Sequence, residues 1–191
     1  MKSFMLLGLV YLLCACASRH QDHFYVLEPL PTGRGQAVAA SPIAVSISVS
    51  LPSSVDRLEL VVNTGTDGVV LLEHERWAAP LSELVGQTLS QDLESRRPDL
   101  LVSAPGGAAS GSAVFKVYVD IVQVTARRGA KVSIAAHWRI VDSRTGREGA
   151  GGQAFDSSLG EGSYADIAHA LSQCLAMLAD AVAAQMPRAG Q

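Results

Sequence analysis

The sequence predicts an α+β fold, in which a largely antiparallel mixed sheet carries two amphipathic helices packed on one of its faces. Several short segments alternate apolar with polar residues, the pattern of strands that bury one face. Two longer segments, residues 81–96 and 163–186, place apolar residues at helical spacing. The resulting order of strands, helix, strands and helix favours an α+β architecture.

The first half of the chain contains four predicted strands. Residues 24–27 form a short one that Pro29 ends, because proline cannot donate a hydrogen bond to a strand ladder. Residues 43–49 alternate Ile and Val with Ala and Ser, which predicts a strand with one buried face. Residues 58–63 and 69–74 predict a hairpin, since the glycine-rich segment between them is typical of a turn.

The first predicted helix covers residues 81–96. Pro80 suits its first turn, where a missing N–H costs little, and Pro98 ends it. Residues 103–112 are rich in Gly, Ser and Ala and predict a flexible loop within one domain. The apolar stripe of the helix contains Leu81, Leu84, Val85, Leu89 and Leu93.

The second half predicts a three-stranded meander. Alternation over residues 115–121 is followed by a shift of the apolar phase, which predicts a β-bulge near Ile121. A turn at 127–130 leads into residues 132–140, the clearest alternating strand of the sequence. Residues 149–155 are expected to return as a glycine-weakened strand.

The second predicted helix begins after Ser163. Its hydroxyl is suited to cap the helix, with Asp166 as the reciprocal partner of a capping box. Cys174 borders the apolar stripe, and residues 188–191 are expected to fray. The stripe itself contains Tyr164, Ile167, Leu171, Leu175, Leu178 and Val182.

The N-terminus resembles the signal peptide of a bacterial lipoprotein. Lys2 precedes an apolar run over residues 4–13, which is too short to cross a bilayer because a spanning helix needs about 20 residues. The run ends in Leu13-Cys14-Ala15-Cys16, which resembles a lipobox, where a peptidase cuts before a cysteine that carries diacylglycerol. Removal of residues 1–15 and lipidation of Cys16 are therefore expected.

Two alternatives remain for this region. Lipidation of Cys14 is disfavoured because branched Leu13 stands where the peptidase requires a small residue, and an ordinary secretory cleavage near Ala17 is the other possibility. Ala17, as a residue other than Asp after the lipidated cysteine, directs a bacterial lipoprotein to the outer membrane. Residues 17–23 form a tether that reaches roughly 25 Å at about 3.3–3.6 Å per residue, so the domain expected over residues 24–187 lies close to the membrane.

Composition limits the function further. The 191-residue chain suffices for one core, and its net charge of −3 argues against nucleic acid, which requires a basic surface. After processing, only Cys174 remains as a free thiol, so no intramolecular disulfide is expected. No cofactor is expected beyond the covalent lipid on Cys16.

The sequence offers little catalytic chemistry. The G-x-S-x-G signature of a serine hydrolase is absent, and the histidines do not occur at metal-ligand spacing. A phosphate-binding loop requires a helix directly after its glycines, and no helix is predicted directly after the glycines at 149–152. We therefore predict no catalytic residue and no metal site. A small basic turn, with Arg127, Arg128 and Lys131, is either a solvated hairpin tip or a contact for lipid phosphates or an acidic partner.

Four segments together resemble the PqiC/YmbA family of auxiliary lipoproteins of ABC-type transport systems. They are residues 24–29 behind the lipobox, residues 51–57 before an apolar strand, residues 77–81 at the helix start, and the hairpin that carries Trp138. Leu58, where many relatives have proline, and the long loop at 103–112 depart from the family pattern.

The resemblance implies a non-enzymatic, self-associating subunit at the periplasmic face of the outer membrane. Its partners would be an MCE-type periplasmic protein and ABC transporter subunits that move phospholipid or related apolar compounds between membranes. The alternative is a structural envelope lipoprotein that binds peptidoglycan or another envelope protein without a role in transport. The residues expected to contact a partner are Tyr25, Leu51, Pro52, Asp56 and Arg57.

Overall fold

The computed structural model describes residues 21–32, 39, 41–65, 67–104, 107, 113–160 and 162–187. The predicted signal peptide, the lipidation site Cys16 and the tail at 188–191 lie outside these residues. So does most of the loop predicted at 103–112, although Ser103 itself belongs to a strand.

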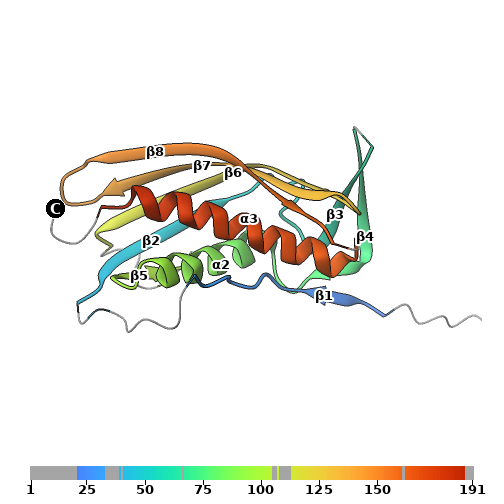
Figure 1. Cartoon of the computed structure of the whole chain (residues 1–191), viewed down its shortest axis with the longest axis horizontal. Helices are drawn as coiled ribbons and strands as arrows, with labels where there is room; N and C mark the ends of the chain where they lie inside the picture. Colours follow the sequence, from blue (N-terminus) through green and yellow to red (C-terminus); the bar gives the residue numbers. More distant parts are fainter. Residues whose placement is uncertain are drawn as a thin grey trace, which may run out of the picture.

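A five-stranded sheet forms the body of the molecule, and both helices cover one of its faces (Figure 1). Helix α2 (Leu81–Arg96) and helix α3 (Tyr164–Gln185) bury the predicted apolar stripes. The capping box of Ser163 and Asp166 is present at the start of α3. The α+β class with two helices on one face of a mixed sheet is therefore confirmed. In order across the sheet, the strands are β5 (Leu100–Ser103), β2 (Ile43–Ser50), β6 (Phe115–Arg127), β7 (Lys131–Asp142) and β8 (Glu148–Ser158).

The strand directions in this sheet divide it into two parts. Strand β2 is parallel to both neighbours, β5 and β6, whereas β6, β7 and β8 form the long antiparallel meander that the sequence predicts. The register of β6 against β7 shifts between Ile121 and Gln123, which confirms the predicted bulge. Strand β5 was not predicted, because four residues directly after a helix are too few to show alternation.

A second sheet of three strands extends from one end of the body. It contains β1 (His23–Tyr25), β4 (Gly68–Trp77) and β3 (Glu59–Thr64) in the order β1-β4-β3. The predicted β3–β4 hairpin is confirmed, although β4 continues to Trp77. The sequence suggested one sheet, whereas the structure has two. Alternation shows which face of a strand is buried but does not show which strand lies beside it.

The core lies between the five-stranded sheet and the helices. Trp138 of β7 is buried there, and its Nε1 donates to Gln185 Oε1 at 3.0 Å. Helix α3 is long and apolar enough to cross a membrane, but most of that apolar segment is buried within the fold. Cys174 on α3 is fully buried, and this burial raises the pKa of its thiol to about 12. The thiol therefore remains protonated and unreactive at neutral pH.

Candidate functional site

The predicted contact turn at residues 51–57 connects β2 to β3 and lies at the start of α2. The carbonyl of Pro52 accepts hydrogen bonds from the backbone N–H groups of Val55 and Asp56, each at 3.0 Å. Asp56 Oδ1 accepts from the backbone N–H of Ser82 at 2.9 Å, in the first turn of α2. A carboxylate at this position satisfies an otherwise unpaired helix N–H and complements the helix dipole. Asp56 thus fastens the turn to the helix.

The predicted contact residue Tyr25 lies on the opposite side of β4 from this turn. It pairs with Trp77 in the β1–β4 ladder, and its hydroxyl donates to Glu75 Oε2 at 2.5 Å. Burial, followed by this carboxylate, raises the pKa of Tyr25 to about 12. The hydroxyl is therefore a hydrogen-bond donor within the fold at any ordinary pH.

The structure brings the two predicted contact regions to one end of the molecule. Trp77 donates its backbone N–H to the carbonyl of Leu58 at 2.7 Å, while its cross-strand partner on the other side is Tyr25. Leu51 and Pro52 are half-buried. Arg57 Nε is buried and has no hydrogen-bond acceptor among the residues that the structure describes. Much of this region is therefore internal support for the junction between the two sheets.

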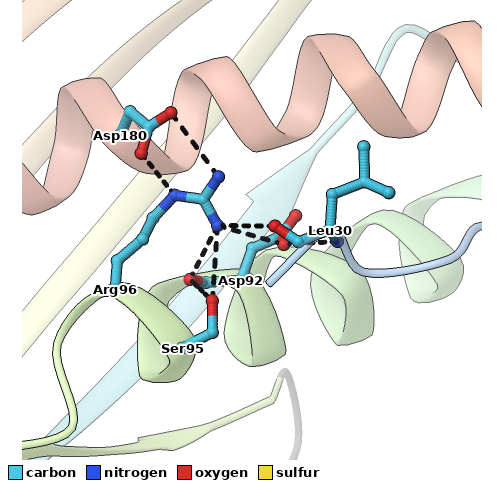
Figure 2. Close-up of polar contacts among 5 residues, drawn as sticks. All are labelled: Leu30, Asp92, Ser95, Arg96 and Asp180. Carbon is cyan, nitrogen blue, oxygen red and sulfur yellow. Dashed lines mark hydrogen bonds and ion pairs between the residues drawn. The ribbon is translucent and has the colours of Figure 1, made fainter. Parts of the chain in front are cut away.

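An extended segment after β1, residues 26–32, crosses both helices, and we call it the strap. Its backbone is bonded to both: Glu28 N–H donates to Ser172 Oγ of α3 at 3.1 Å, and Leu30 N–H donates to Asp92 Oδ1 of α2 at 2.8 Å. Figure 2 shows the second contact within a larger polar network. The strap therefore connects the N-terminal segment to the helical layer.

Arg96 is the centre of that network (Figure 2). Its guanidinium donates to the carbonyl of Leu30 at 3.2 Å, to Asp92 Oδ1 at 3.2 Å and to Asp180 Oδ1 at 2.5 Å, so it joins the strap, α2 and α3. The Asp92 side chain is fully buried, and burial raises its pKa. This buried pair was not among the residues predicted from the sequence. A signal was present, because an Asp and an Arg four residues apart lie beside the apolar stripe of the helix.

The β3–β4 hairpin stands out from the body beside the start of α3 (Figure 1). Leu60 and Val62 of β3 are buried, whereas Val69, Val70 and Leu71 of the neighbouring strand β4 are 55%, 44% and 41% exposed. Because successive side chains of a strand point to opposite faces, Val69 and Leu71 share one face of the hairpin and Val70 lies on the other. The glycine-rich turn between the two strands predicted the hairpin but not this exposure.

A groove of about 690 Å³ separates this hairpin from the β6–β7 turn and the first turn of α3. Val62, Val70 and Leu72 line it from the hairpin, and Arg127 and Arg128 line it from the turn. The basic turn that the sequence left open as a solvated tip or a contact therefore borders a concave surface.

The acidic and histidine side chains of the described residues do not gather into a metal-binding cluster. No group of three or more potential metal ligands occurs among these described residues. Two of the histidines pair with carboxylates at the sheet edge, His23 with Glu75 at 3.1 Å and His74 with Asp22 at 2.9 Å. These contacts hold β1 and the residue before it against β4.

The sequence matches the family described as the ABC-type transport auxiliary lipoprotein component over residues 25–183. The match covers most of the chain, so the protein belongs to this family, as the resemblance to PqiC/YmbA proteins indicated. No curated protein sequence matches the chain.

Solved structures share the fold. The crystal structure of an uncharacterized protein has a TM-score of 0.71 at 18% identity, with coverage of 87% of this chain and 99% of its own. Protein XCC0632 from Xanthomonas campestris has a TM-score of 0.63 at 15% identity, with coverage of 84% and 92%. The PelC dodecamer from Paraburkholderia phytofirmans has a TM-score of 0.46 at 10% identity, with coverage of 82% and 96%. At these identities, the first two structures support the fold alone.

Proposed function

We propose that this protein is a non-enzymatic accessory lipoprotein of an ABC/MCE-type transport system. It is anchored through Cys16 at the periplasmic face of the outer membrane. It assists in moving phospholipid or related apolar compounds between membranes and so supports envelope integrity. The family match over residues 25–183 carries this proposal, because the family is that of ABC-type transport auxiliary lipoproteins.

The surface next to the proposed anchor supports this placement. Phe24 of β1 and Val26 of the strap are 63% and 52% exposed, and they follow Cys16 by only 8 and 10 residues. Apolar side chains at this short distance from a lipidated cysteine are suited to contact the membrane surface or a partner held there. The hydrogen bonds of the strap to Ser172 and Asp92 then hold the helices at a fixed distance from these residues.

The proposed partner contacts use the two ends of β4. One region combines Tyr25 with the outer side of the 51–57 turn, where Ser53 and Ser54 are exposed. The other is the face of β4 that carries the exposed residues Val69 and Leu71, an apolar surface suited to a second copy of the chain or to an MCE-type protein.

Co-purification tests the transport role. The tagged full chain, extracted from envelopes in mild detergent, should recover an MCE-type protein together with an ATPase or permease subunit. Cys16→Ala should move the chain out of the membrane fraction, whereas the matched variant Cys14→Ala should leave it there. Recovery of peptidoglycan-associated proteins alone, under conditions that preserve other envelope complexes, would contradict a role in transport.

A further inference from the structure

The groove beside the β3–β4 hairpin has one apolar wall. Register pairs Val62 with Val70 and Leu60 with Leu72, so these four side chains share one face of the hairpin. Leu60 and Val62 are buried, Leu72 is half-buried and Val70 is exposed. The wall is therefore an outward continuation of the hydrophobic core, and it reaches solvent at Val70.

The opposite wall is cationic. Arg128 is held in place: its Nε donates to the carbonyl of Gly162 at 3.0 Å, and its guanidinium lies 4.9 Å from the centre of the Tyr164 ring. Among the described residues, neither Arg127 nor Arg128 forms an ion pair. The residues that line the groove include no acid, although the chain as a whole has a net charge of −3.

We propose that this groove binds a phospholipid with an anionic headgroup. The phosphate lies between Arg127 and Arg128, and an acyl chain lies along Val62, Val70 and Leu72. Guanidinium groups bind phosphate oxygens through paired, charge-assisted hydrogen bonds, and the apolar wall removes the chain from water. The volume of about 690 Å³ lies within the range of about 300–1,000 Å³ that is common for ligand sites.

The two walls together determine the chemical class of the ligand. A free inorganic phosphate would leave the apolar wall in contact with water, and a purely apolar ligand would leave both arginines without a counter-charge. An anionic amphiphile satisfies both walls at once. The inference rests on the proposed transport role and extends it by naming a molecule that the accessory subunit would hold.

Binding of a soluble short-chain lipid tests the site. The full chain carrying Cys16→Ser, so that no lipid of its own competes, is titrated with dihexanoyl phosphatidylglycerol below its micelle concentration and followed by calorimetry. The lipid should bind at least tenfold more tightly than dihexanoyl phosphatidylcholine and than inorganic phosphate. Arg127 is exposed and unpaired among the described residues, so Arg127→Ala should fold normally and weaken binding about tenfold. Arg144→Ala, an equal change of charge in the β7–β8 turn, is the matched control and should bind as the parent chain does.

A second variant tests the apolar wall separately. Val70→Thr keeps the size of the side chain and should weaken lipid binding several-fold without changing the weak binding of inorganic phosphate. Three results would overturn the proposal: equal affinity for both lipids, phosphate binding as tight as lipid binding, or self-association of the chain that Val70→Thr abolishes while lipid binding is unaffected. These measurements use purified protein, so their outcome is independent of whether transporter subunits co-purify.

Discussion

The helix-covered body and the projecting hairpin differ in how far their apolar side chains are buried and their charged side chains are paired. In the body, a buried carboxylate, Asp92, is bonded to the strap and to Arg96, and the large apolar side chains between sheet and helices are buried. At the hairpin end, Val69, Val70 and Leu71 are exposed, and Arg127 across the groove forms no ion pair among the described residues. Stability is therefore concentrated in one region, and capacity for binding is concentrated in the other.

This division has a physical reason. An unsatisfied polar group costs free energy when it is buried, so the bonds of Asp92 Oδ1 to Leu30 and Arg96 help to keep the body folded. Exposed apolar residues and unpaired surface charges cost the isolated chain little, and a partner or ligand can satisfy them later. Substitutions in the body should therefore change the free energy of unfolding, and substitutions at the hairpin should change binding.

The largest effect on stability is expected at Asp92. Asp92→Ala removes the acceptor of the Leu30 N–H and leaves the buried Arg96 guanidinium without one of its two carboxylates. Loss of one partner of a buried ion pair typically costs about 3 kcal/mol or more. Urea unfolding should show this loss, whereas Gln91→Ala, at an exposed position of the same helix, should change the free energy of unfolding by less than about 0.5 kcal/mol. A loss as small as that of the control would show that the strap contributes little.

Asp92 should also make the free energy of unfolding depend on pH. Because burial raises the pKa of Asp92, the folded state binds its proton more tightly than the unfolded state does. The stability that this group contributes is present below its unfolded pKa of about 4 and is lost as pH rises through the folded pKa. Asp92→Asn keeps an acceptor for Leu30 and removes the titration. The difference in unfolding free energy between the parent chain and this variant should therefore change over that pH range and be constant above it.

A smaller loss is expected in β8. Gly151 pairs with Trp138, and a Cβ at this position would overlap the indole ring. Gly151→Ala should destabilise the protein by about 1–3 kcal/mol, because the buried ring has to move. Gly149 lies on the same strand with no atom within 4 Å of its Cβ position, so Gly149→Ala should be neutral or slightly stabilising. Equal melting temperatures for the two variants would contradict the close packing.

The smallest effect on stability is expected at the hairpin tip. Val69 is 55% exposed, so Val69→Thr should change the free energy of unfolding by less than about 0.5 kcal/mol. Val62→Ala, at a buried position of the same hairpin, should cost more, because it leaves a cavity in the core. If Val69→Thr instead destabilised the isolated chain as much as Val62→Ala does, the hairpin tip would be part of the stable core.

The sequence alone determined the features that depend on neighbouring residues. The apolar stripes of α2 and α3, the capping box at Ser163, the β3–β4 hairpin and the bulge near Ile121 are all confirmed, because each follows from spacing within a few residues. The family was also recognisable from four short segments. Features of this kind can be predicted from the sequence because periodicity and turn chemistry are local properties.

Only the tertiary structure decided which of these elements meet. Alternation did not show that β2 lies parallel to β5 and β6, or that β1, β3 and β4 form a sheet of their own. It also did not show that Asp56 binds the start of α2, or that Arg127 and Arg128 face Val70 across a groove. These contacts join residues far apart in the chain. The free energy that selects them comes from packing and from pairing of buried polar groups, and the local sequence pattern does not specify the partner.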